Sequence, residues 1–279
     1  IAESVNYRRG ASYALRNLGY IANETGEYAA AARYLSRSLE ISRKLSDIHE
    51  IAIVLLGLGG VNQSLGRYTE AEQQFRDCLA ICESSGDQVG QAMTYSRLGS
   101  VLALQHDTEG ALDAYRRGIA IFESIGEPWG IAMCSSRLGE LYLQEGDYEQ
   151  AERCYQQTYT LSEQINDPRG RIIAMTGLGN AAFEQKHTAQ ALEHFKQAYL
   201  DALKVDIAPY ALAALFGIAR WLIADNQYQR AATLLGIVLR HPAVNQTLHG
   251  EARKQIYRLK TLLSPQAVED ALHESSSAA

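Results

Sequence analysis

The chain is short of the residues that mark several large classes of protein. Only 5 of its 279 residues are proline and 4 are cysteine, and no stretch approaches 18 uninterrupted apolar residues. A membrane-spanning helix needs about 20 such residues, so none is predicted. The formal net charge of −6 argues against a general nucleic-acid surface, because that surface needs a basic stripe to neutralise phosphates. We therefore expect neither a membrane nor a nucleic acid as partner, although a local basic patch stays compatible with this composition.

Motifs for catalysis or cofactor binding are also missing. The sequence has no glycine-rich phosphate loop, no His-Glu metal motif on a helix and no nucleophile elbow, and its seven histidines are scattered. Cys78 and Cys82 are four residues apart, as in half of a metal site, but no second pair completes it. All four cysteines are better interpreted as small core residues in a reducing compartment. The sequence thus predicts a cytoplasmic protein that is not an enzyme and binds no cofactor or metal.

A Leu-Gly dipeptide that returns every 40 residues organises the chain. Small residues at fixed positions let two helices approach closely, and a large residue fills the space between neighbouring pairs. A constant period of this length predicts a stacked repeat array, in which each repeat buries its apolar face against the next. The dipeptides are Leu18-Gly19, Leu58-Gly59, Leu98-Gly99, Leu138-Gly139 and Leu178-Gly179, with Ile218-Ala219 in the sixth position. An alanine column follows (Ala31, Ala71, Ala111, Ala151, Ala191, Ala231), then a bulky column (Leu35, Phe75, Tyr115, Tyr155, Phe195, Leu235).

These columns resemble the tetratricopeptide repeat (TPR), over about residues 7 to 240. The resemblance implies an all-α fold, a right-handed α-solenoid of six helix-turn-helix TPR units plus C-terminal capping helices. The repeats are longer than the usual TPR of about 34 residues and lack its closing proline. Long repeats of this kind are similar to those of kinesin light chains, and to the carboxy-terminal sensor regions of bacterial signal-transduction ATPases and transcription activators.

The pattern also predicts the boundaries of the array. We expect the array over residues 1–242, capping helices over 243–273 and a disordered tail over 274–279. The array should stop at His241-Pro242, because proline cannot continue a helix. Its first repeat has no polar capping helix before it, so we expect a fragment of a longer protein. The six repeats are predicted at about 7–46, 47–86, 87–126, 127–166, 167–206 and 207–242.

Residues at the helix ends predict the connections. Asp47, Asp87 and Asp167 open first helices, where a carboxylate can accept hydrogen bonds from first-turn amides. The turns within repeats carry residues that accept a left-handed backbone, namely Gly26, Gly66, Gly146 and Asn226. In the third and fifth repeats His106 and Lys186 replace them, which predicts looser turns. Residues 247–263 predict a basic amphipathic helix, whose cations are solvated or contact an acidic partner or a membrane surface.

The functional surface is predicted from the TPR resemblance, which places the first helices of the repeats along a concave wall. Arg97 and Arg137 occupy equivalent positions in adjacent repeats and could bracket a carboxylate. The two-arginine carboxylate clamp of chaperone-binding TPR proteins is not reproduced, so binding of chaperone tails is disfavoured. The candidate partner-binding residues are Asn17, Tyr20, Asn23, Gln63, Ser96, Arg97, Ser100, Ser136, Arg137, Glu140, Thr176, Asn180, Phe183, Phe216 and Arg220.

Three hypotheses for function follow. The first is a non-catalytic scaffold that binds a protein or peptide in the concave groove, as the recognition or sensor region of a larger bacterial signalling protein. The second is a sensor for a small-molecule inducer, as in some activators that the chain resembles, with Gly57, Gly177 and Gly217 leaving room for the ligand. The third is end-to-end self-association through the uncapped first repeat.

Overall fold

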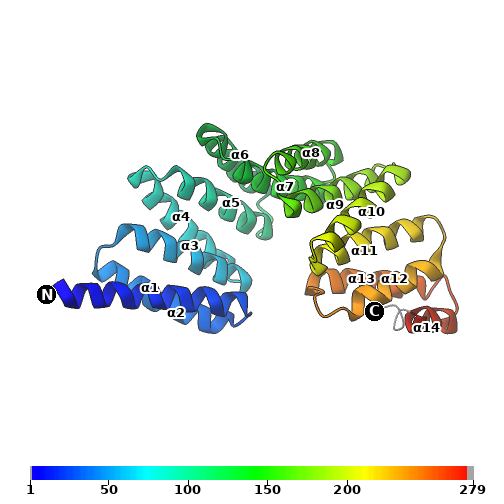
Figure 1. The fold of residues 1–279 in the computed structure, drawn as a ribbon, viewed down its shortest axis with the longest axis horizontal. Coiled ribbons are helices and arrows are strands. Elements are labelled where there is room, and N and C mark those ends of the chain that lie inside the picture. Colours follow the sequence, from blue (N-terminus) through cyan, green and yellow to red (C-terminus); the bar gives the residue numbers. More distant parts are fainter. Residues whose placement is uncertain (1, 275–279) are drawn as a thin grey trace. The chain divides into compact units, whose positions relative to one another are not determined.

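The computed structural model describes residues 2–274, and all regular secondary structure in that range is helical. The prediction of an all-α fold is confirmed. Six antiparallel helix pairs are followed by two further helices (Figure 1). None of these helices is both long and apolar enough to cross a membrane. The helices are α1 Ala2–Glu24, α2 Tyr28–Lys44, α3 Ile48–Ser64, α4 Tyr68–Ser85, α5 Gln88–Leu104, α6 Thr108–Ile125, α7 Pro128–Glu145, α8 Tyr148–Gln164, α9 Pro168–Glu184, α10 Thr188–Lys204, α11 Ala208–Ala224, α12 Tyr228–Arg240, α13 Gln246–Leu259 and α14 Pro265–Glu274.

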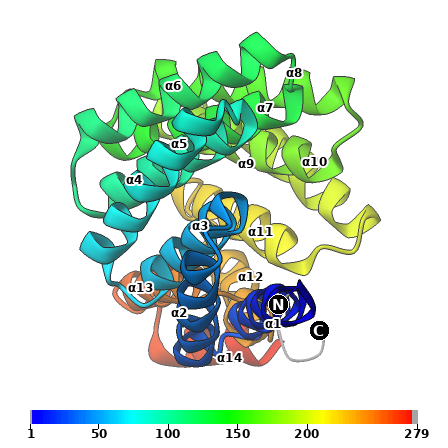
Figure 2. The same ribbon diagram turned by 90° about the vertical axis from the view of Figure 1, so that its left-hand side faces the viewer.

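The chain forms two compact units that divide between Cys134 and Ser135, within α7. In the first unit each helix from α1 to α6 packs on the next in chain order (Figures 1 and 2). In the second unit α8 to α12 follow the same rule, and α12 also packs against both α13 and α14. First helices of adjacent repeats touch as well, α1 with α3, α3 with α5 and α9 with α11. Each unit therefore stacks its helix pairs through neighbours alone, as the repeat period predicted.

The repeated glycine sits where the two helices of a repeat approach most closely. A Cβ atom built on Gly59 would lie 2.4 Å from Cε1 of Phe75, the bulky residue of the same repeat. The bulky side chain therefore occupies the space that any larger residue in the glycine column would need. The equivalent pairs are Gly19 with Leu35, Gly99 with Tyr115, Gly139 with Tyr155 and Gly179 with Phe195.

Turns within the repeats are uniform, which corrects one prediction. His106 and Lys186 take φ angles of 64° and 67°, in the same left-handed region as Gly66 at 73°. The hydrogen bonds also match, since the Asp107 amide donates to the Leu102 carbonyl at 2.9 Å, which is the C-terminal Schellman pattern. These turns are therefore not looser than the others. The prediction failed because glycine is favoured in the left-handed region but is not required there.

Aspartates cap helices at more positions than predicted. The predicted caps Asp47, Asp87 and Asp167 each accept a hydrogen bond from a first-turn amide. Asp107 and Asp147 do the same for the second helices α6 and α8, at 3.0 and 3.2 Å. Charged caps thus occur on first helices (α3, α5, α9) and on second helices (α6, α8), each typically stabilising by about 1 kcal/mol.

The last two helices cover the end of the array. Helix α12 ends at Arg240, and Ile256 and Leu259 of α13 pack with Leu235 of α12 in one buried cluster. The cations predicted to be exposed on α13 do face solvent, at Arg253, Lys254, Arg258 and Lys260. Glu274 is the last residue of α14, and the rest of the predicted tail, 275–279, lies outside the described residues.

Candidate functional site

In the first unit the predicted contact residues differ sharply in exposure. Asn17 and Arg97 are exposed, whereas Asn23 and Gln63 are half-buried. Tyr20 is used for packing, because its hydroxyl donates to the Ile53 carbonyl at 3.1 Å and its ring covers the backbone of α3. A partner on this wall would therefore meet Asn17 and Arg97 before the other predicted residues.

Two predicted contact residues of the first unit are removed from the surface. Ser96 is 2% exposed and Ser100 is 9% exposed. The Ser100 hydroxyl donates to the Ser96 carbonyl at 3.1 Å and accepts from the Tyr115 hydroxyl at 3.1 Å. The Ser100 hydroxyl thus satisfies polar groups inside the helix pair, and the burial of both serines argues against their predicted role as partner contacts.

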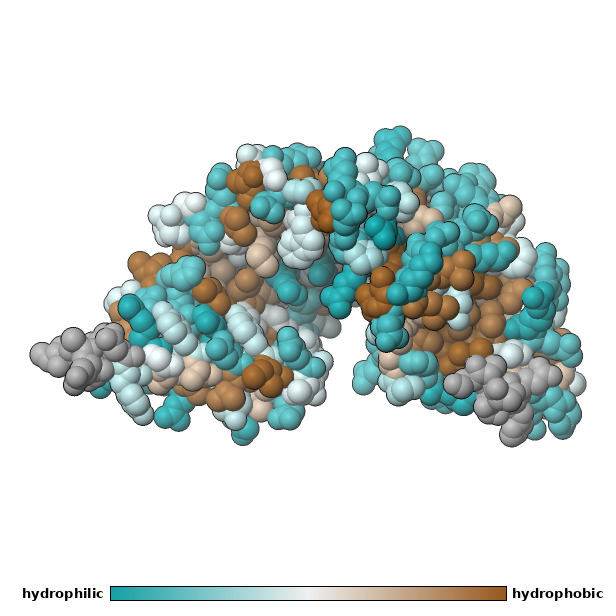
Figure 3. All heavy atoms as spheres, viewed as in Figure 1, coloured by the Kyte–Doolittle hydropathy of each residue, from teal (hydrophilic) through white to brown (hydrophobic). Residues whose placement is uncertain are grey.

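In the second unit a cavity of about 560 Å³ opens beside the first helices of the repeats. Five predicted residues line it, contributed by α7, α9 and α11: Glu140, Thr176, Asn180, Phe216 and Arg220. We call this cavity the C-terminal groove. Its other lining residues are Leu143, Gln144, Tyr148, Tyr155, Ile173, Gly177, Glu184, Tyr210, Ala213, Asn245, Thr247, Leu248 and Glu251. Figure 3 shows hydrophobic atoms gathered over α11, which carries a single charged residue, Arg220.

Arg220 is held by three neighbours, of which Asn180 and Glu184 line this groove and Phe183 does not. Its guanidinium group donates to Asn180 Oδ1 at 3.0 Å and to Glu184 Oε1 at 2.5 Å. The same group lies 4.6 Å from the centre of the Phe183 ring, a cation–π contact. The structure thus places Arg220 in contact with two other candidate residues, Asn180 and Phe183. The charge of Arg220 is compensated inside the protein by Glu184.

Aromatic side chains form much of the groove lining. Tyr148, Tyr210 and Phe216 are half-buried, and Tyr155 is 5% exposed. Burial raises the pKa of the Tyr155 hydroxyl, and the nearby Glu140 carboxylate raises it further. The phenol therefore keeps its proton at neutral pH and can donate a hydrogen bond into the groove.

The charged lining of the groove is acidic. It contains Glu140, Glu184 and Glu251, and among its described residues Arg220 is the single cation. Glu251 also pairs with Lys254 at 2.6 Å outside the groove. Glu140 is exposed and forms no ion pair with the described residues. A cation entering the groove would find an uncompensated carboxylate there.

Sequence reasoning missed part of this lining. Tyr210 lies on α11 six residues before Phe216, which is not a same-face spacing on a helix, so helical spacing from Phe216 did not point to it. Leu248 and Glu251 come from α13, which packs against α11, and no repeat column pointed to them. Ser136 and Arg137 are half-buried residues of α7 outside the groove lining, and the joint use of Arg97 and Arg137 stays a prediction.

Aromatic rings lie directly against the glycines that were expected to leave room for a small molecule. A Cβ atom at Gly57 would lie 2.6 Å from the Tyr20 ring, and one at Gly177 would lie 2.4 Å from the Tyr155 ring. Gly217 is covered in the same way by Phe195, at 2.5 Å. Rings of the preceding repeat therefore occupy the space directly beside these glycines, which consequently do not support an inducer site of their own.

The cysteines are core residues, as predicted. All four are buried and unbridged, and burial raises the pKa of the Cys82 thiol to about 12. The Cys78 thiol donates to the Ala52 carbonyl at 3.3 Å. Among the residues that the structure describes, no three His, Cys, Asp or Glu side chains are grouped to hold a metal ion.

Comparison with known proteins supports the family resemblance. No curated protein matches the chain. A signal-transduction ATPase with numerous domains (STAND) and a TPR sensor, from Pyrococcus horikoshii, is similar with a TM-score of 0.74 at 16% identity, over 95% of this chain and 42% of that one. The apo form of RapI gives a TM-score of 0.66 at 12% identity, over 98% of this chain and 86% of that one. The TPR-like repeats of a putative kinesin light chain from Podosopora anserina give a TM-score of 0.59 at 15% identity, over 70% of this chain and 95% of that one.

At these identities the likeness to solved structures is one of fold. The tetratricopeptide repeat family model matches two overlapping stretches, residues 10–84 and 50–124, and a separate third stretch, residues 131–199. Together these stretches cover more than half of the chain. The chain therefore belongs to the tetratricopeptide repeat family.

Proposed function

We propose that this chain is a non-catalytic protein-binding scaffold that holds a peptide segment of its partner in the C-terminal groove. The observation that carries the proposal is the composition of that groove, in which aromatic rings and three glutamates, of which Glu140 forms no ion pair with the described residues, line a cavity of about 560 Å³. Rings supply large apolar contact area at low conformational cost, and acceptor groups select the partner's charge.

The chemistry of the lining favours a partner segment with a lysine or arginine side chain. Glu140 offers a carboxylate, while Tyr148 and Phe216 offer ring faces to the cation and its aliphatic stem. A partner carboxylate would instead meet Glu140, Glu184 and Glu251, because Arg220 is already paired with Glu184. We infer that the groove selects basic rather than acidic segments.

The likeness to the TPR sensor of a STAND ATPase supports a place within a larger signalling protein. This chain spans 42% of that ATPase chain, so a comparable protein would carry other domains beside the array. In that setting the scaffold would recognise the partner and leave the chemistry to another part of the protein. TPR scaffolds serve through binding, which agrees with the absence of catalytic motifs in the sequence.

A peptide-binding measurement tests the proposal. A fluorescein-labelled synthetic peptide of alternating lysine and leucine should bind the wild-type chain, as followed by fluorescence anisotropy. Glu140→Lys should weaken binding by about tenfold, because a charge contact of roughly 1.4 kcal/mol is replaced by repulsion. Glu149→Lys is the matched control, since Glu149 is a 79% exposed glutamate on α8 outside the groove. Equal affinities of the two variants would refute the groove assignment.

A further inference from the structure

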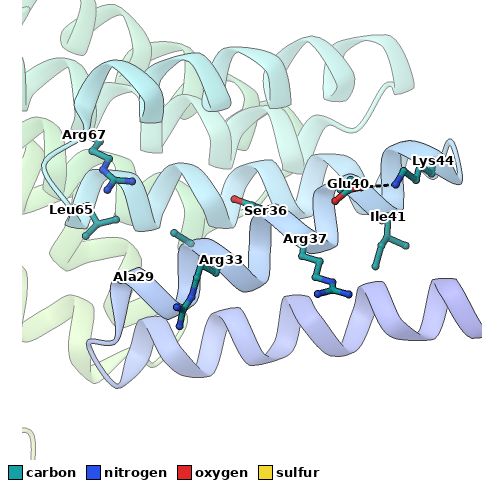
Figure 4. Close-up of a pocket in the computed structure, with 10 residues that line it drawn as sticks. Ala29, Arg33, Ser36, Arg37, Glu40, Ile41, Lys44, Leu65 and Arg67 are labelled. Atoms are coloured by element: carbon teal, nitrogen blue, oxygen red, sulfur yellow. Dashed lines mark hydrogen bonds and ion pairs between the residues drawn. The ribbon is translucent and has the colours of Figure 1, made fainter.

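A second cavity, in the first unit, carries the opposite charge. It has a volume of about 800 Å³ and is built on α2, with the end of α3 and the start of α4 forming its other side (Figure 4). We call it the basic groove. It is lined by Ala29, Ala32, Arg33, Ser36, Arg37, Glu40, Ile41, Lys44, Leu65 and Arg67.

Most of the positive charge in the basic groove is uncompensated. Glu40 is the one acidic residue in the lining, and it pairs with Lys44 at 2.5 Å (Figure 4). Arg33, Arg37 and Arg67 are exposed, and none of them forms an ion pair with another described residue. Three guanidinium groups thus surround one cavity in a chain whose net charge is −6.

Comparison between the repeats shows that this arrangement is specific to α2. The positions of Arg33 and Arg37 recur 40 residues later on α4 as Gln73 and Asp77, which share a hydrogen bond of 2.8 Å. On α6 they recur as Asp113 and Arg117, which form an ion pair of 2.8 Å. Side chains four residues apart lie on one helix face, so these later pairs are attractive and the two arginines of α2 repel each other. The acidic neighbour on this helix, Glu40, interacts with the charge of Arg37 but is itself paired with Lys44.

We propose that the basic groove binds an acidic segment of a partner protein, in which carboxylates are interleaved with an apolar side chain. Guanidinium groups bind carboxylates in a planar, two-pronged geometry, and Arg33, Arg37 and Arg67 supply three of them. Leu65, Ile41 and the alanines of α2 provide the wall for the apolar side chain.

The number of cations favours a peptide over other anions. Membrane-surface binding is typical of clusters of about four to eight Lys or Arg side chains, whereas three uncompensated arginines line this cavity. A nucleic acid needs a row of cations along many phosphates, whereas these cations surround one cavity on an acidic chain. This site lies in the first unit and does not depend on the proposed use of the C-terminal groove.

The variant Arg33→Glu separates binding from folding. It places a glutamate four residues before Arg37, which reproduces the attractive acid–arginine pair of α6, so the melting temperature should be unchanged or higher. A fluorescein-labelled peptide of alternating glutamate and leucine should bind the wild-type chain. We expect Arg33→Glu and Arg67→Glu each to weaken that binding by at least about tenfold, and raised salt to weaken it in the wild type.

The control is Arg76→Glu, which makes the same change of charge at an exposed arginine of α4 outside the groove. It should bind within about twofold of the wild type. The proposal is overturned if the wild type does not bind this peptide, if Arg33→Glu has no effect, or if the control loses as much. It is equally overturned if a thymidine oligonucleotide or a phosphatidylserine vesicle binds through Arg33 in place of the peptide.

Discussion

A single hydrogen atom at position 59 decides how closely α3 and α4 can pack. Gly59 faces the Phe75 ring, whereas at Gly60, the next residue of the same helix, an added Cβ would meet nothing within 4 Å. An added methyl group would meet a neighbouring ring at Gly59 but not at Gly60, whereas the conformational free-energy cost of glycine in a helix is the same at both positions. They therefore form a matched pair for measuring what close approach contributes.

We predict opposite effects of alanine at these two positions. Gly59→Ala should lower the free energy of unfolding by about 1–3 kcal/mol, because the ring has to shift. Gly60→Ala should raise it by about 0.5–1 kcal/mol, because alanine is the better helix former. Urea unfolding followed by circular dichroism measures both, and a loss at Gly60→Ala as large as that at Gly59→Ala would contradict the prediction.

Left-handed turn residues allow a second test. Lys186 adopts φ 67° at an exposed turn, a conformation that costs a residue with a Cβ about 1–2 kcal/mol. Lys186→Gly should therefore stabilise the second unit by about 0.5–1 kcal/mol, after the entropy of glycine in the unfolded chain is subtracted. Gly66→Lys is the reverse change in an equivalent turn, and its melting temperature should fall. A fall for both variants would show that the backbone angle is not the cause.

Residue identity in the sequence predicted local geometry well where one residue type is strongly preferred. The glycine column and the aspartate caps follow from steric and hydrogen-bonding rules that act within a few residues. The turn at His106 was predicted to be looser than it is, because the surrounding structure can hold a residue in a backbone conformation that it does not itself favour. The burial of Ser96 and Ser100 could not be predicted, because burial depends on how adjacent helices rotate, which a column of small residues leaves open.

At the scale of elements, one ion pair ties the first helices of two repeats together. Arg16 of α1 donates to Glu50 of α3, and the Glu50 side chain is 2% exposed. Burial raises the pKa of the Glu50 carboxyl, while Arg16 acts in the opposite direction. Because the folded-state pKa is raised, the contribution of Glu50 to stability is largest below its ordinary value of 4.5 and falls as pH rises through the folded-state pKa.

Removing the arginine should expose that dependence. Arg16→Met leaves a buried carboxylate without a partner, so the free energy of unfolding should fall by about 3 kcal/mol at pH 7. The deficit should shrink as the pH is lowered, since protonated Glu50 no longer carries an unpaired charge. Unfolding by urea at several pH values measures this change.

The matched control is the double variant Arg16→Met with Glu50→Leu. It removes both charges, so its stability should lie close to that of the wild type and its pH dependence should be lower. A single variant whose deficit is independent of pH would mean that Arg16 acts through packing of its aliphatic stem.

At the scale of the whole molecule, the sequence predicted the repeat architecture better than the site. The period of 40 residues appears in every pair from α1 to α12, because close packing imposes the same residues on each repeat. The site depends on what differs between repeats. Glu184 of the fifth repeat compensates the charge of Arg220 in the sixth repeat. Glu251 lines the C-terminal groove from α13, a helix that the sequence predicted only to cap the array.

Helix α13 also contributes to the stability of the second unit. Leu259 of α13 is fully buried in the cluster that closes α12, while Tyr257, two residues earlier, is 76% exposed. Leu259→Ala should lower the free energy of unfolding by about 2–4 kcal/mol, through lost apolar contact and the cavity left behind. Tyr257→Ala on the same helix should change it by less than about 0.5 kcal/mol.

A sharper test is to locate the part of the chain that the Leu259→Ala variant destabilises. In a stack whose members contact only their neighbours, destabilising one end loosens that end first. Native-state hydrogen exchange of Leu259→Ala should therefore show faster exchange in α11 to α14, with protection of α1 to α6 kept at the wild-type level. Because α13 also lines the C-terminal groove, the same variant should weaken binding of the lysine–leucine peptide while leaving the glutamate–leucine peptide unaffected. Uniform acceleration along the chain would instead show that the two units unfold as one cooperative body.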